Sequence, residues 1–292
     1  MTSPTRIDRQ SSAVDRALSV ANAPPPSAPA TTLDPTGSIV PLPQTLGWVQ
    51  IPATEKLPDA IGGSGLRATA LRGDPTAAYE IGVRFAEGKG VAPNFDAAAK
   101  WYDRAAQAGV VPAMFRLGTL YEKGLGVKRD IDLARRYYLQ AAERGNAKAM
   151  HNLAVLAADG GGAGADYRGA AQWFRKAADR GIADSQFNLG ILYARGIGVE
   201  QNLAESFKWF SLAAAQGDAD AGRKRDDIAK RLDAQSLAAA KLSIQTFTPE
   251  LQPDDAINVA TPAGGWDSAP ADTVAVKPAS KPAAARHTAA AH

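Results

Sequence analysis

The chain has 292 residues, of which 45% are hydrophobic, 22% charged and 7% aromatic, and its 33 Lys and Arg against 30 Asp and Glu give a formal net charge of +3. This composition excludes collagen-like, mucin-like and strongly polyionic proteins. No apolar run approaches the ~18 to 20 residues that cross a bilayer, so we expect no direct membrane span. The chain has no cysteine, and its three histidines, His151, His287 and His292, are scattered. We therefore expect no catalytic, metal or cofactor site.

Composition divides the chain into three parts. Residues 1–63 form a Pro/Ala-rich arm, and residues 237–292 read as a short helical end followed by a Pro/Ala/Lys tail. Prolines break helices, and such segments carry little apolar surface to bury, so we expect the arm and the tail to be disordered. Nearly all aromatic and periodic apolar residues lie between them. The ordered domain is therefore expected at residues 64–236.

Several residue types recur in this central part with a step of 36 residues. A fixed period of about 20 to 50 residues is the signature of a repeat architecture. The repeats are predicted at 74–109, 110–145, 146–181 and 182–217. The clearest columns are Gly73, Gly109, Gly145, Gly181 and Gly217, and Trp101, Tyr137, Trp173 and Trp209.

Each repeat is predicted to contain two helices. Apolar residues at i, i+3, i+4, i+7 and i+8 mark one face of a helix, and this spacing is kept by Ala78, Ile81, Gly82, Phe85 and Ala86, and again by Ala98, Trp101, Tyr102, Ala105 and Ala106. Asp74 followed by Pro75 predicts an N-cap with proline at the first helical position. Gly109 is expected to end the second helix in the left-handed conformation.

The turn between the two helices carries a Gly-x-Gly-Val pattern, first seen as Gly88, Gly90 and Val91. Two glycines allow a sharp reversal through positive φ, and the valine can fill the gap between the helices. A phosphate-binding loop is the competing interpretation. No Gly-Lys-Ser/Thr follows and no strand precedes the pattern, so we interpret these glycines as architectural.

One helical pair cannot bury its aromatic face alone, so four pairs are expected to stack into an all-α, right-handed α/α solenoid with capping helices. Leu66 and Ala70 lie one period before Tyr102 and Ala106, which predicts a cap helix at 64–73. The segment 218–236 is highly charged, with bases and acids interleaved. This favours a solvated C-terminal cap over a nucleic-acid patch, so we expect no nucleic-acid partner.

The repeated pattern is Ala-x-Tyr/Phe-x-Leu-Gly-x-x-Tyr-x-x-Gly-x-Gly-Val, then Ala-x-x-Trp-Tyr/Phe-x-x-Ala-Ala-x-x-Gly. It resembles the SEL-one-like repeat (SLR), a relative of the tetratricopeptide repeat, over residues 74–217. The resemblance implies an α/α superhelix that serves as a protein-binding scaffold or adaptor rather than as a catalyst.

A closer likeness is to the C-terminal repeat region of bacterial PodJ-like polar localisation factors. It is carried by residues 57–63, 79–91, 196–206 and 244–250. It implies a role in cell-envelope or polar-localisation complexes on the periplasmic side. In those proteins a coiled coil and a membrane anchor precede the repeats, and neither is seen here, so we expect a soluble chain that is cytoplasmic if it stands alone.

The relationship to tetratricopeptide solenoids implies that the first helices line a concave groove. An aromatic and aliphatic stripe with charged edges there would suit an extended or helical peptide. The aromatic column can equally be packing between helices, and His151 can be either a size-compatible substitute or a group that senses pH or binds an acid. The predicted groove residues are Tyr79, Val83, Phe115, Thr119, Lys123, Lys148, His151, Val155, Phe187, Ile191 and Arg195.

Three functions are weighed. The first is a non-catalytic scaffold for an unidentified protein partner. The second is a peptidoglycan-associated envelope module, favoured by the likeness and by a basic tail at Lys277, Lys281 and Arg286. The third, a β-lactam-binding enzyme, is remote because cysteine and a Ser-x-x-Lys motif are missing.

Phe247 and Trp266 are further expected to fold back on the last helices, and residues 48–51 are expected to fold back on the other end.

Overall fold

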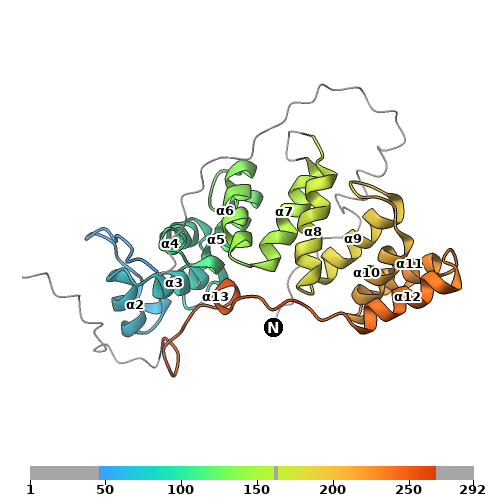
Figure 1. The fold of residues 1–292 in the computed structure, drawn as a ribbon. Coiled ribbons are helices and arrows are strands. Elements are labelled where there is room, and N and C mark those ends of the chain that lie inside the picture. The colour runs from blue at the N-terminus through green and yellow to red at the C-terminus, as the bar shows by residue number, and fades with distance from the viewer. Residues whose placement is uncertain (1–45, 161–163, 268–292) are drawn as a thin grey trace, which may run out of the picture.

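The computed structural model describes residues 46–160 and 164–267, and all regular structure in these ranges is helical (Figure 1). A 3-10 turn, η2 (Asp59–Ile61), comes first. The α-helices are α2 (Ser64–Leu71), α3 (Pro75–Glu87), α4 (Phe95–Gln107), α5 (Val111–Lys123), α6 (Ile131–Glu143), α7 (Ala147–Asp159), α8 (Tyr167–Asp179), α9 (Ala183–Arg195), α10 (Leu203–Ala215), α11 (Ala219–Ala229), α12 (Ala234–Gln245) and α13 (Asp254–Ile257).

The predicted fold class is confirmed as an α/α solenoid. Helices α3 to α10 form four antiparallel pairs, one in each 36-residue repeat, and every one of these helices has 13 residues. Figure 1 shows the pairs stacked in chain order from the teal end to the yellow end. Within the described ranges, no helix combines the length and apolar character that a bilayer crossing requires.

Local sequence signals set the helix boundaries. The Asp74 carboxylate accepts hydrogen bonds from the backbone N–H groups of Thr76 and Ala77, and Pro75 occupies the first helical position of α3, as predicted. Gly88 ends α3 with φ of +71°. The second helices α4, α6, α8 and α10 each begin at an Asn or Asp whose side chain caps the first turn.

One cap gives a direct test of this local contribution. The Asp130 carboxylate accepts a 2.8 Å hydrogen bond from Leu133 N–H at the start of α6 and is exposed. Asp130→Ala is expected to lower the free energy of unfolding by about 1 kcal/mol, measured by urea denaturation. Asp132→Ala, a change in the same turn that leaves the cap intact, is the control, and equal losses for both variants would contradict this role of Asp130.

In three of the four repeats a glycine in the middle of the first helix lies directly against an aromatic ring, while the third repeat has Ala154 in this column. In the first repeat the ring of Tyr102 lies so close to Gly82 that a methyl group there would be 2.7 Å from a ring carbon. Gly118 under Tyr138 and Gly190 under Phe210 repeat this contact at 2.8 Å. The glycine column therefore lets an aromatic ring of the second helix rest on the backbone of the first.

The predicted N-terminal cap is present and larger than expected. Leu66 and Ala70 are fully buried, as their period predicts. The stretch from η2 to the end of α2 occupies the second-helix position one period before α4. Contrary to the expectation for 1–63, the part at 46–63 packs on this cap, because Ile61 inserts fully into the core and Glu55 pairs with Arg104. Residues 1–45 lie outside the described part.

In the C-terminal part, α11 lies within the segment 218–236 and α12 extends into the segment where a short helical end is expected. Helix α11 occupies a first-helix position and buries only Ala221 and Ile228, as expected of a solvated cap, but α12 adds a helix of 12 residues. Phe247 then packs edge-on against Trp209, with ring centroids 5.7 Å apart, which agrees with its predicted return to the last helices.

Trp266 returns to the other end of the solenoid, so its predicted place on the last helices is wrong. It joins the core cluster of the first repeats and is 8% exposed. The neighbouring Asp267 binds Arg84 of α3, and Figure 1 shows the connecting segment running from α12 past α13 toward α2. The predicted basic residues Lys277, Lys281 and Arg286 lie outside the described residues.

Candidate binding surface on the first helices

The aromatic column of the first helices packs inward in every repeat. Each residue of this column is half-buried and packs against an aromatic ring on the second helix of the same repeat. The ring centroids are 5.7 Å apart for Tyr79 and Tyr102, 5.9 Å for Phe115 and Tyr138, 5.7 Å for His151 and Phe174, and 5.6 Å for Phe187 and Phe210. Only the outer edges of these rings are therefore open to a partner.

His151 takes part in a polar pair that the other repeats lack. Its Nδ1 lies 2.8 Å from the hydroxyl of Ser185, which is fully buried in the first turn of α9. The positions equivalent to Ser185 are Ala77, Ala113, Ala149 and Ala221. Burial lowers the pKa of His151 from its usual value, and the nearby Asp184 carboxylate opposes this shift.

The aliphatic column is mostly unavailable for binding. Val83 is 8% and Ile191 is 4% exposed, so both belong to the core rather than to an accessible groove. Val155 and Thr119 are half-buried, and the Thr119 hydroxyl accepts a 3.1 Å hydrogen bond from Tyr138. The predicted stripe is thus narrower than the sequence indicated, because the packing of the repeats buries some of the side chains on this side of the first helices.

The predicted cations lie at the ends of the first helices. Lys148 is in the first turn of α7, while Lys123 and Arg195 are the last residues of α5 and α9, and all three are exposed. No ion pair involves them within residues 46–160 and 164–267. Their charge is therefore directed to solvent or to a partner.

Two further cations lie beside the aromatic column and were not among the groove residues predicted from the sequence. Arg116 is exposed on α5 and interacts with the Tyr79 hydroxyl, and Lys224 on α11 lies 5.9 Å from the ring centre of Phe187. Both occupy the column that follows the aromatic one, which reads Glu80, Arg116, Asn152, Asn188 and Lys224. Extending the 36-residue step into the charged cap would have found Lys224.

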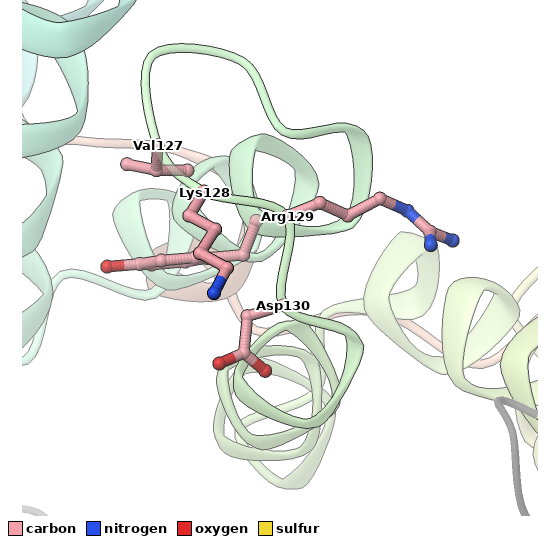
Figure 2. A pocket seen from close by; sticks show the side chains of 5 residues that line it. Val127, Lys128, Arg129 and Asp130 are labelled. Atoms are coloured by element: carbon pink, nitrogen blue, oxygen red, sulfur yellow. The ribbon is translucent and has the colours of Figure 1, made fainter.

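A shallow surface hollow lies at the turn between α5 and α6. It is lined by Tyr121, Val127, Lys128, Arg129 and Asp130. Figure 2 shows Lys128 and Asp130 on the same side of the turn, with Arg129 pointing away from them. The hollow is open to solvent, and among the described residues no cluster of His, Asp and Glu could hold a metal ion.

Comparisons with known proteins agree with this architecture. The Sel1 repeat family matches residues 75–110, 111–146, 147–182 and 183–218. A Sel1 repeat protein from Oxalobacter formigenes is 32% identical over 59% of this chain and 70% of its own, with a TM-score of 0.50. The protective antigen c5321 of uropathogenic Escherichia coli, which displays an SLR fold, is 29% identical over 60% of this chain, with a TM-score of 0.53.

The chain belongs to the Sel1 repeat family. It spans 39% of the length of the Escherichia coli antigen. A comparison of the sequence with curated proteins found no match. Sel1 repeat proteins are generally protein-interaction scaffolds, and the repeat is typically a non-catalytic fold.

Proposed function

We propose that this protein is a non-catalytic scaffold that binds an acidic segment of a protein partner on the face formed by its first helices. The observation that carries the proposal is the set of exposed cations, Lys123, Lys148 and Arg195, that lie at the ends of the first helices and have no ion-pair partner in the described chain, on helices whose aromatic rings are half-buried. Aromatic edges supply apolar contact, and unpaired cations attract carboxylates and speed association.

The contact geometry changes the choice of test. Phe115 and Phe187 support Tyr138 and Phe210, so alanine at these positions would disturb the fold as well as the surface. Exposed charges can be reversed with little effect on stability. The cations are therefore the better probes.

The triple variant Lys123→Glu, Lys148→Glu and Arg195→Glu is expected to reduce the affinity for the partner at least about tenfold, because the loss of three charge contacts of about 0.5 kcal/mol each amounts to about 1.5 kcal/mol. The measurement is affinity co-purification from the native cell with quantitative mass spectrometry. A second triple variant, Lys128→Glu, Arg136→Glu and Lys241→Glu, makes the same change in net charge on other exposed positions.

Partners that are lost with the first variant and kept with the second are the partners of this face. Equal capture by the wild-type protein and both variants would contradict the proposal. A role in the cell envelope or in polar localisation is part of the same proposal, and proximity labelling in the native cell tests it by reporting compartment and neighbours together.

A further inference from the structure

Residues 246–267, here called the C-terminal strap, run back along the solenoid in the opposite direction to the repeats (Figure 1). The strap follows the edge formed by the turns that join one repeat to the next. Glu250 N–H donates a 2.8 Å hydrogen bond to the Asp179 carbonyl, and Ala147 N–H donates a 3.0 Å bond to the Gln252 side chain. Asn146 Nδ2 donates a 2.6 Å bond to the Ala256 carbonyl.

Two charged contacts repeat along this edge, and a third, at Arg84 of α3, holds the far end of the strap. Arg180 pairs with Glu250 at 2.8 Å, Arg144 with Asp255 at 3.3 Å, and Arg84 with Asp267 at 2.9 Å. The arginine side chains are only 13–21% exposed, whereas the carboxylates of the strap are 55–68% exposed. Arg144 and Arg180 lie one repeat apart, so equivalent turns contact successive acids.

The arginines are held by the solenoid itself. Arg144 also donates a 2.8 Å hydrogen bond to the Gly109 carbonyl, and Arg180 donates a 2.9 Å bond to the Lys176 carbonyl. A guanidinium that is already fixed loses little freedom when it binds a carboxylate. The edge is therefore preorganised for acidic groups, and the strap contributes the exposed half of each pair.

The strap is attached at a few points rather than along its length. Phe247, Ala256 and Trp266 insert into the core clusters. Between them Leu251 is 93% exposed and Ile257 is 48% exposed. Because ion pairs with exposed partners contribute only about 0–1 kcal/mol each, the anchors and the high effective concentration of a tethered segment hold the strap in place.

We propose that this edge of inter-repeat turns is a second polypeptide-binding surface, which the strap fills in cis. The partner it fits is an extended acidic segment with carboxylates about five residues apart, like Glu250 and Asp255, and such a segment binds by displacing the strap. Within the described chain, the hydrogen bonds and ion pairs of the strap involve none of the predicted groove residues. This surface therefore shares no hydrogen-bonded or ion-paired residue with the predicted groove, although the strap also contacts the first helices α3, α5 and α7.

The test uses a fluorescent peptide with the sequence of residues 246–267, added to the full-length protein and followed by anisotropy. In the wild-type protein the tethered strap competes with the peptide. Trp266→Ala with Asp267→Asn weakens the strap at one end and is expected to raise the affinity for the peptide at least about tenfold. Adding Arg144→Glu and Arg180→Glu is expected to remove this gain.

Arg136→Glu with Arg168→Glu, at exposed positions on second helices, is the matched control and should keep the gain. Equal peptide affinity for the wild-type protein and the weakened-strap variant would overturn the proposal, and so would a gain that survives Arg144→Glu with Arg180→Glu. These substitutions do not touch Lys123, Lys148 or Arg195, so failure here leaves the test of the first-helix face intact.

Hydrogen exchange on the wild-type protein decides the case if the weakened-strap variant unfolds. A strap that can be displaced must open without unfolding of the repeats. Amides of residues 248–265 are then expected to exchange at least about 100-fold faster than those of α7 and α8. Equal protection of the strap and these helices would show that the strap is an integral part of the fold and would overturn the proposal.

Discussion

Gly126→Ala is expected to lower the free energy of unfolding by about 2–5 kcal/mol. Gly126 has φ of +68°, a conformation that costs an L-residue about 1–2 kcal/mol. Its added methyl group would also overlap the backbone of Phe95 and Asp96, at the start of α4 in the preceding repeat. The backbone of α4 cannot move aside as a flexible side chain can. The steric clash is therefore expected to cost about 1–3 kcal/mol in addition to the conformational cost. Urea denaturation followed by circular dichroism measures the loss.

Gly217→Ala separates the two contributions. Gly217 also has positive φ, at +93°, but a methyl group there would meet nothing within 4 Å. This variant is expected to lose only the conformational part, about 1–2 kcal/mol. If both variants lose the same amount, the close approach between repeats contributes nothing and Gly126 matters only for its turn.

The contact at Gly126 shows why the paired glycines recur. The same overlap would occur between Gly198 and the backbone at Tyr167, again in the preceding repeat. In these two turns the second glycine thus rests on the first residue of the second helix of the preceding repeat, and it sets the distance between repeats. The sequence predicted positive φ here, but the approach of the neighbouring repeat is a long-range contact that only the structure shows.

The 36-residue step predicted most of the fold because each column repeats one packing environment. Leu66 and Ala70 were placed in a cap helix by stepping back one period, and both are fully buried. The same reasoning could not place Ile61, because the positions one to four periods later, Ala97, Leu133, Gly169 and Glu205, share no residue type, or Trp266, which follows the repeats. A single apolar residue among prolines has no period, so its burial depends on where the chain happens to return.

The candidate binding surface was predicted less well for a related reason. The spacing of Val83 from Tyr79 puts both on one side of α3, but the spacing does not tell how far the packing of the repeats covers each residue on that side. The structure leaves Tyr79 half-buried and Val83 buried. Periodicity fixes the direction of a side chain, whereas exposure depends on the contact between repeats.

His151 and Ser185 offer a second stability test, with an expected effect of about 1–3 kcal/mol. His151→Phe restores the aromatic residue of the other repeats but leaves the fully buried Ser185 hydroxyl without its imidazole partner. Loss of a partner for a buried polar group costs about this much. Adding Ser185→Ala removes the hydroxyl and gives this position the alanine that follows Tyr79, Phe115 and Phe187 by 34 residues. The double variant is therefore expected to recover the lost stability at pH 7.5.

The same pair predicts a dependence on pH. The pKa of His151 is lowered in the folded protein, so below about pH 6.5 the unfolded chain binds more protons at this residue than the folded one. The contribution of His151 to stability is therefore lost as the pH falls from about 6.5 toward its folded pKa, and it is constant above pH 7.5. Asp184 reduces the effect because its carboxylate favours the charged imidazole.

Urea denaturation of the wild-type protein and of the double variant at pH 7.5 and 5.5 measures this contribution by difference, because other titrating groups are shared. The wild-type protein is expected to lose up to about 1.4 kcal/mol more than the double variant over this range. Parallel losses would mean that His151 accepts a proton in the folded state as readily as in the unfolded chain. The imidazole would then be a polar substitute in an aromatic column with no influence on how the third and fourth repeats respond to acid.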